Sequence, residues 1–184
     1  MKGGLKMDNI EFSKKFKSML AGSKDDFDLV YREMKKPVFT VIYRITGNWY
    51  DSEEILQDLF LRLLRLAPET KISNPRAYIF TMARNMSIDK LKSNKHDSEY
   101  IEGEYSEEDE DYEDNNNQFD KALIDKAFDM LEPSQKEILT LRLNGNLKFK
   151  DIAKMVNLPL GTVLGRYSKG IKNLKTIIER DLKR

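Results

Sequence analysis

Basic side chains recur at helical spacing near the C-terminal end of the chain. The segment after residue 160 has no acidic residue before position 179 and carries Arg166, Lys169, Lys172, Lys175 and Arg180. Arginine and lysine donate hydrogen bonds to phosphate oxygens and to base edges, so such a helix can bind nucleic acid. An ordinary amphipathic helix with a solvated basic face has the same pattern, so the neighbouring elements have to decide between the two.

Those neighbouring elements have the proportions of a helix-turn-helix. A short helix is predicted over 149–156, a break follows at Asn157-Leu158-Pro159, and a long helix is expected from Gly161 onward. A short helix, a tight turn and a longer basic helix favour DNA binding over a merely solvated face. Upstream, helices are predicted over 119–131 and 134–143, and Ser134 and Glu137 have capping-box spacing at the start of the second one.

The first half of the chain is also predicted to be helical. Apolar residues recur at helical spacing over 27–45, 51–66 and from Asn74-Pro75 to about residue 94, and residues 8–20 form a further short helix. Pro37 predicts a kink or a break in the first of these segments. Asp51 and Glu54 have the spacing of a capping box. With no alternating strand pattern of useful length, the expected fold class is all-α.

Charge divides the chain into three blocks. The net charge is +6 over 1–96, −11 over 97–118 and +6 over 119–184. The middle block has no basic residue and few aliphatic ones, so it is predicted to be a flexible, disordered linker. The expected organisation is an N-terminal extension (1–24), a helical domain (25–94), an acidic linker (95–118) and a second, four-helix domain (119–184). The linker either covers the basic faces as a phosphate mimic or is a solvated spacer.

Several function classes are excluded by composition. The 184 residues include no cysteine and one histidine, His96, which removes disulfides, thiolate zinc sites and histidine triads. No glycine-rich phosphate loop or metal-ligand spacing occurs, so we expect no catalysis and no cofactor. The longest apolar run, 37–43, is far too short for a membrane helix, and the first residues lack the apolar middle of a signal peptide. We therefore expect a cytoplasmic protein without membrane insertion.

Three stretches resemble one family. LEPSQKEILTLRLNGNLKFKDIAKMVNLPLGTVLGRYSKGIKNLK resembles the C-terminal domain of the extracytoplasmic-function (ECF, group IV) bacterial sigma factors. TGNWYDSEEILQDLFLRLLR resembles that family's polymerase-binding helix pair, and NPRAYIFTMARNMSIDKLKSNK resembles its promoter-melting helix. The resemblance implies that 25–94 is sigma region 2 and that 119–184 is sigma region 4. It also implies core RNA polymerase and promoter DNA as partners, and it leaves an anti-sigma factor open as a third.

The resemblance implies roles for residues in the first domain. The polymerase-contact helix carries Glu54, Leu56, Gln57, Asp58 and Phe60. Carboxylates and an amide on an exposed face can bind arginines of a partner. Glu54 alone also fits a helix cap, and Leu56 also fits the core.

The promoter-melting helix has its own predicted residues. Asn85 matches the family's residue for capturing a base of the melted strand, and Asp89 lies one turn further on. Tyr78 and Phe80 are candidates for stacking on bases, although aromatic residues at helical spacing also fit a core. The full set predicted for the downstream (−10) element is Arg76, Tyr78, Phe80, Arg84, Asn85, Asp89, Lys90 and Lys92.

The long C-terminal helix is implied to read the upstream (−35) element. Its predicted contact residues are Thr162, Arg166, Tyr167, Ser168, Lys169 and Lys172. The chain departs from the family here, because Leu164 and Gly165 stand where a basic residue and a serine are frequent. Leucine can touch a thymine methyl group but forms no hydrogen bond, and glycine weakens a helix by about 1 kcal/mol relative to alanine.

The resemblance and the residues together predict a promoter-specificity subunit of RNA polymerase. Two other function classes compete with it. A repressor or activator of duplex DNA would use the second domain and would not need the Gln57-Asp58 face. A protein-interaction module would keep the first domain while its DNA-binding elements decayed.

Overall fold

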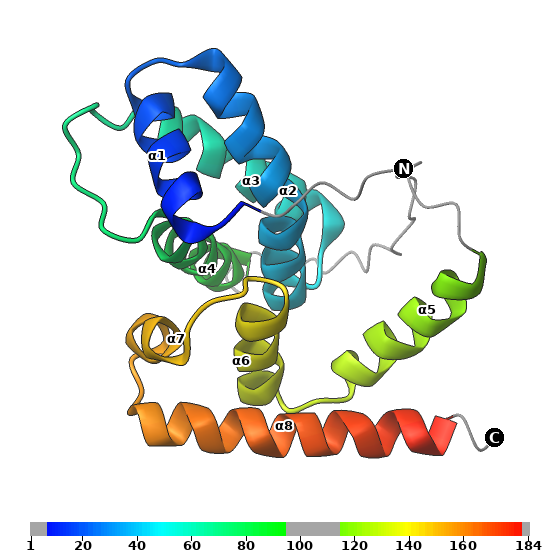
Figure 1. Ribbon diagram of the computed structural model, residues 1–184. Coiled ribbons are helices and arrows are strands. Elements are labelled where there is room, and N and C mark those ends of the chain that lie inside the picture. The colour runs from blue at the N-terminus through cyan, green and yellow to red at the C-terminus, as the bar shows by residue number, and fades with distance from the viewer. Residues whose placement is uncertain (1–6, 95–114, 182–184) are drawn as a thin grey trace. The chain divides into compact units, whose positions relative to one another are not determined.

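The computed structural model describes residues 7–94 and 115–181, and within those residues every regular element is a helix (Figure 1). The chain divides into two compact units, Met1–Gly103 and Glu104–Arg184. This confirms the all-α fold class with two helical domains. Most of the predicted acidic linker lies outside the described residues, so its flexibility and the predicted domain boundaries stay predictions.

The first unit contains four helices, and the other three pack around α2. These are α1 (Asn9–Leu20), α2 (Lys24–Thr46), α3 (Trp49–Leu64) and α4 (Pro75–Asn94). The Ser23 side chain caps the start of α2, and Gly47 ends the helix in the left-handed conformation with φ 68°. Pro37 lies inside α2 without ending it, so the predicted break does not occur there. The α2 residues Val30, Met34, Val38 and Ile42 are fully buried and form the centre of this core.

The start of α3 differs from the prediction by two residues. The helix begins at Trp49, and its cap is Asn48, whose side-chain oxygen accepts the Asp51 N–H at 3.0 Å. The Asp51–Glu54 capping box is therefore not the start of the helix. At α4 the prediction is confirmed, because Asn74 Oδ1 accepts the Ala77 N–H at 3.1 Å and the helix starts at Pro75. Proline fits this position, where its missing N–H would have no partner within the helix.

Residues predicted as an N-terminal extension contribute to the core of the first unit. The helix predicted over 8–20 is present as α1, and Phe12, Phe16 and Met19 on it are buried against α2 and α4. Asp8 caps α1 by accepting the N–H groups of Ile10 and Glu11. Burial of three such side chains stabilises the unit by several kcal/mol, at about 1.5–3 kcal/mol each. Helix α1 is thus a structural part of the unit.

The second unit contains α5 (Asn115–Asp129), α6 (Pro133–Leu143), α7 (Phe149–Val156) and α8 (Leu160–Asp181). Helix α8 contacts each of the other three. Helix α7 ends at Asn157, which is left-handed with φ 53°, and α8 starts three residues later. This geometry confirms the predicted helix-turn-helix.

The packing of the second unit fixes the orientation of α8. Its core cluster consists of Phe128, Leu131 and Leu139, against which Tyr167, Leu174 and Ile177 of α8 pack. Helix α6 starts at Pro133 with Glu132 as its cap residue and without a side-chain capping bond, so the predicted Ser134 capping box is wrong. Ser134 instead donates its hydroxyl to Glu132 Oε1 at 2.7 Å.

Across the described residues, no helix combines the length and the apolar character that crossing a membrane requires. This agrees with the short apolar runs of the sequence.

Candidate nucleic-acid and partner interfaces

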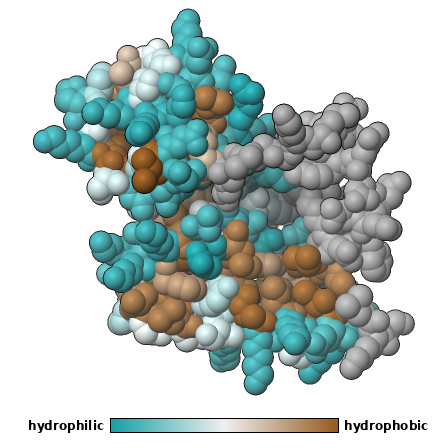
Figure 2. Space-filling model, in the orientation of Figure 1, coloured by the Kyte–Doolittle hydropathy of each residue, from teal (hydrophilic) through white to brown (hydrophobic). Residues whose placement is uncertain are grey.

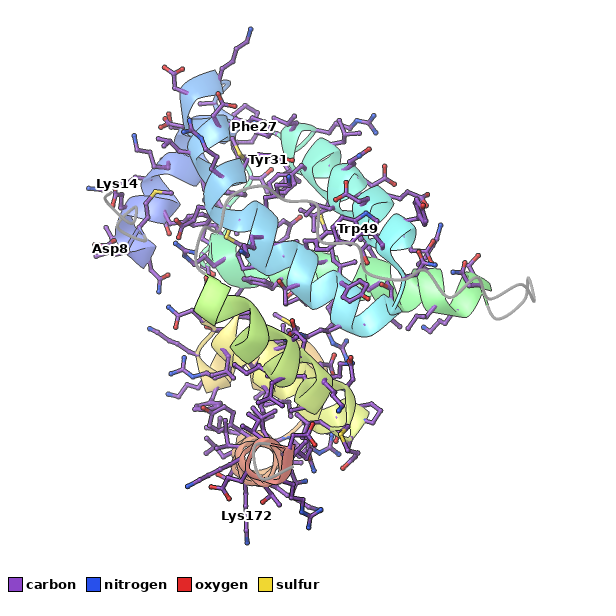
Figure 3. All side chains as sticks on the ribbon, turned by 90° about the vertical axis from the view of Figure 1, so that its right-hand side faces the viewer. Asp8, Lys14, Phe27, Tyr31, Trp49 and Lys172 are labelled. Carbon is purple, nitrogen blue, oxygen red and sulfur yellow. The ribbon has the colours of Figure 1, made fainter. Side chains whose placement is uncertain are left out.

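Helix α3 presents a polar face and buries an apolar one. Glu54, Gln57 and Asp58 are exposed, whereas Leu56 and Phe60 are 2% and 4% exposed. Leu56 and Phe60 therefore belong to the core, which for Leu56 is the alternative that the sequence left open and for Phe60 corrects the predicted polymerase contact. Phe60 packs edge-on against Tyr31 of α2, with ring centroids 4.7 Å apart, and Figure 3 shows Tyr31 beside Phe27. The aromatic contact fixes the rotation of α3 and so directs its carboxylates outward.

Lys90 connects the polar face of α3 to α4. Its Nζ lies 2.7 Å from Glu54 Oε2 and 3.5 Å from Asp51 Oδ1. The hydrogen bond to Glu54 raises the pKa of Lys90 above its ordinary value, and the charge of Asp51 acts in the same direction against partial burial. Asn94 donates to the other oxygen of Asp51 at 2.8 Å. Lys90, predicted as a DNA contact, is therefore engaged by carboxylates of α3.

An open groove runs between α3 and α4 at this network. Acidic side chains line it from both helices, together with two basic ones and a floor of Ile55 and Met86. The lining charged residues are Glu54, Asp58, Arg62, Asp89 and Lys90. The residues predicted for a protein partner and those predicted for DNA thus meet along a single groove.

The predicted DNA residues of α4 separate into two groups. Asn85, Asp89 and Lys92 are exposed, and Lys92 Nζ lies 4.0 Å from Asp89 Oδ1. Phe80 is 1% exposed and belongs to the core, which corrects its prediction as a stacking residue. Tyr78 and Arg84 are half-buried, so their predicted contacts stay predictions.

Arg76 is a structural residue of the first unit. It is 6% exposed, its Nη2 donates to Glu33 Oε1 at 2.7 Å and to the Met7 carbonyl at 2.9 Å, and its guanidinium lies 4.1 Å from the centre of the Phe12 ring. These contacts hold α1, α2 and α4 together and use the guanidinium inside the fold. The prediction that Arg76 contacts DNA is therefore wrong.

Helix α8 exposes most of its predicted DNA residues. Thr162, Ser168, Lys169 and Lys172 are exposed, and Figure 3 shows Lys172 pointing away from the second unit. Arg166 is half-buried. The Tyr167 ring packs edge-on against Phe149 of α7 at 4.9 Å, so it also holds α7 on α8.

Some features of these surfaces were not predicted from the sequence. Asp51 and Asn94 complete the Lys90 network from positions 43 residues apart, and no local pattern links them. The space-filling view in Figure 2 shows hydrophobic residues on the second unit, and exposed apolar side chains there include Leu160, Leu164 and Ile171. Leu164 was singled out from the sequence as a departure from the family, whereas the exposure of Leu160 and Ile171 is not predicted by helical periodicity, which identifies only the core stripe.

The fold is that of a helical protein with two units, the second of which contains a helix-turn-helix. The family model for sigma-70 region 2 matches residues 30–96, and that for sigma-70 region 4 matches residues 121–174. The chain belongs to the sigma-70-type sigma factors, and within them to the ECF sigma factors.

Curated relatives are similar over different lengths. The ECF RNA polymerase sigma factor SigW of Bacillus subtilis is 24% identical over 183 residues, which is 92% of this chain and 97% of SigW. SigJ of Mycobacterium tuberculosis is 34% identical over 73 residues, covering 40% of this chain and 23% of SigJ. This chain therefore spans nearly all of SigW but about a quarter of SigJ.

Two solved structures share the fold. The sigma factor RpoE of Bartonella quintana, solved with the anti-sigma factor NepR, has a TM-score of 0.67 at 18% identity and covers 84% of this chain and 97% of its own. CnrH, solved with the cytosolic domain of CnrY, has a TM-score of 0.60 at 14% identity, with 91% and 97% covered.

Proposed function

We propose that this protein binds core RNA polymerase and directs it to promoters, which it recognises and melts. The observation that carries the proposal is the juxtaposition of two surfaces on the first unit. The exposed carboxylates of α3 lie across one groove from Asp89 of α4, and Lys90 joins the two helices. The exposed Asn85 lies one helical turn before Asp89 on α4. A polymerase-binding surface beside a strand-capturing surface is what a specificity subunit requires.

On α3, the contact is electrostatic. Glu54, Gln57 and Asp58 lie at i, i+3 and i+4 and are all exposed. Arginines on a partner can form charge-assisted, bidentate hydrogen bonds with the carboxylates. The buried Leu56 and Phe60 keep this face in position without touching the partner.

On α4, the exposed Asn85 captures an unstacked base. An amide offers a donor and an acceptor, so it can pair with a base edge. Capture offsets the few kcal/mol that unstacking a base costs. Lys92 and Arg84 then bind the phosphates of the same strand.

On α8, the exposed basic residues bind the upstream element as duplex DNA. Thr162 lies at the start of the helix, where its hydroxyl can bind a phosphate. Lys169 and Lys172 contribute backbone contacts, which add affinity but not sequence preference.

The wider assignment follows from the family. As a specificity subunit the protein carries out no reaction of its own and acts in the cytoplasm. The two solved relatives were captured with NepR, an anti-sigma factor, and with the cytosolic domain of CnrY. An anti-sigma factor is by analogy a candidate partner of this chain.

Run-off transcription tests the proposal. Bacterial core polymerase and fragmented genomic DNA are incubated with and without the protein, and new discrete transcripts are expected. Asp58→Arg reverses a charge on the proposed polymerase face and should remove both the transcripts and the binding to core. Asp28→Arg, an exposed carboxylate on α2, is the matched control and should leave both intact.

Two other outcomes would contradict the proposal. The absence of new transcripts, with binding to core polymerase intact, would indicate an inactive sigma factor. The absence of both new transcripts and binding to core polymerase would favour the alternative function, a regulator that binds duplex DNA on its own.

A further inference from the structure

Helix α8 contains three glycines, and packing within the protein explains why one of them has no side chain. Gly170 is buried, and a Cβ placed on it would lie 2.6 Å from Leu139 Cδ1 and 3.2 Å from Gln135 Cβ. Its lack of a side chain lets α6 and α8 approach closely. Gly161 and Gly165 are exposed, and a Cβ on either would meet nothing within 4 Å.

The two unexplained glycines lie on the side of α8 that faces away from its core. The core side is formed by Val163, Tyr167, Gly170 and Leu174. At about 100° per residue, the line opposite to it runs through Gly161, Gly165, Ser168 and Lys172. This line contains Ser168 and Lys172, two of the residues predicted to contact the upstream element.

Leu164 borders this line and is 41% exposed. On the other border lie Thr162 and Lys169, which are also exposed. The outward surface of α8 therefore has a bare backbone at its centre, an apolar side chain on one flank and polar side chains on the other.

An exposed glycine inside a helix costs backbone entropy and stabilises nothing. Because no residue that the structure describes lies within 4 Å of a Cβ built at Gly161 or Gly165, we assign the absence of these side chains to a molecule that docks on α8. A major groove admits an α-helix, and removal of two side chains lets the helix backbone move closer to the base edges. Leu164 then enters the groove beside it.

We propose that Leu164 packs against thymine 5-methyl groups in the upstream element while α8 approaches the bases along Gly161 and Gly165. The sequence preference of the second unit then comes from methyl contact and close fit more than from bidentate hydrogen bonds to guanine. Lys169 and Lys172 hold the phosphates on either side. This inference rests on the proposed function, because it names what α8 reads in the promoter.

Removal of the methyl groups alone tests the contact. Promoters mapped by run-off transcription are synthesised with either thymine or deoxyuridine in the upstream element, so that the two templates differ only by 5-methyl groups. The full chain with core polymerase should bind the deoxyuridine template about fourfold more weakly for each methyl that Leu164 covers. Equal binding of the two templates would overturn the proposal.

Two variants identify the residue responsible. Leu164→Ala should bind both templates equally, because it no longer touches the methyl. Ile171→Ala is the matched control, since Ile171 is 37% exposed and lies two turns further on the same flank. It should keep the difference between the templates. A difference that persists in Leu164→Ala would assign the methyl contact to another residue and overturn the proposal.

The close approach has a separate test. Gly165→Ala places a methyl group in open space in the free protein, so the Tm should stay unchanged or rise by a few degrees. Binding to the thymine template should nevertheless fall at least tenfold. A more stable variant with unchanged DNA affinity would overturn the approach along the glycines.

The tests also separate this inference from the proposed function. Transcripts that start equally well from thymine and deoxyuridine templates would leave the sigma-factor function in place and remove the methyl contact. If no template is transcribed, duplex DNA selected from a random pool by the full chain alone is compared in the same two forms. A chain that selects no sequence would overturn the inference.

Discussion

The two helices predicted to bind DNA, α4 and α8, differ in how much of their basic charge is used inside the protein. On α4, Arg76 is buried with Glu33, and Lys90 is paired with Glu54. On α8, Lys169 and Lys172 are exposed and form no ion pair with any other residue that the structure describes. Helix α8 thus leaves these two cations available to a ligand, whereas α4 uses two of its four basic residues, Arg76 and Lys90, in ion pairs with other helices of the first unit.

This difference suits two kinds of DNA. Duplex DNA is a dense line of phosphates and is bound by exposed cations over a long range. A melted strand is available only after polymerase and protein have opened it, and capture of a base needs a fixed amide more than a free charge. Helix α4 accordingly exposes Asn85 on a rigid support, and α8 exposes lysines.

The largest effect is expected from Arg76→Ala. The substitution leaves Glu33 as a nearly buried carboxylate without its partner and removes the bond to the Met7 carbonyl. Loss of one partner of a buried pair costs about 3–5 kcal/mol. Chemical denaturation of the full chain should show the transition of the first unit shifted by that amount. Arg65→Ala, at an exposed position, is the control. An Arg76→Ala protein of normal stability with weak DNA binding would restore the DNA role of Arg76.

A smaller and more selective effect is expected from Asn85→Ala. The side chain is exposed, so stability should change little. Transcription from duplex promoters should fall about tenfold, which corresponds to one lost base contact of about 1.4 kcal/mol. The same loss should appear on a template with a pre-melted bubble, because base capture and not duplex binding is removed. Permanganate reactivity of unpaired thymines measures the open complex. Normal opening by Asn85→Ala would contradict base capture.

The comparison of the two helices also explains what the sequence can predict. Apolar periodicity depends on neighbours three and four residues away, so each helix in the described part of the chain, and the helix-turn-helix, was predicted. The start of α3 was misplaced because two residues can cap a helix there, and Asn48 rather than Asp51 is the cap. Helical periodicity and helix capping both depend on residues a few positions apart, so the predicted start of α3 was wrong by only two residues.

Roles that depend on distant partners were not predictable in the same way. Arg76 lies 43 residues from Glu33, and Lys90 lies 36 residues from Glu54. A basic residue close in sequence to other basic residues is predicted as a DNA contact. The distant carboxylate with which it pairs is known only from the structure. Family position also does not distinguish a residue that touches a partner from a buried residue that supports the contact. For this reason contacts were predicted for three residues that are buried in the core, Leu56, Phe60 and Phe80.

A modest effect is expected from Lys172→Ala. Removal of one exposed phosphate contact should weaken DNA binding by a similar factor for every sequence. The slope of the logarithm of affinity against the logarithm of salt concentration should become smaller by about 0.9. Lys14→Ala on α1 removes an equally exposed lysine from the first unit and is the control for a general charge effect. An unchanged salt slope in Lys172→Ala would contradict a phosphate contact at this position.

The smallest effect is expected from Lys90→Met, which removes a cation that α4 uses in ion pairs with α3. Glu54 is 62% exposed at the side chain, so solvent screens the pair and the loss of stability should be about 0.5 kcal/mol. The pKa of Lys90 is raised above 10.5 by Glu54, so the contribution is fully present below pH 10.5 and is lost as pH rises through the higher folded value. The difference in Tm between Lys90→Met and the unaltered protein should therefore stay constant from pH 7 to about 10. A difference that already shrinks across that range would mean that Lys90 is not held by the carboxylates of α3, and that the cations of α4 are as available to DNA as those of α8.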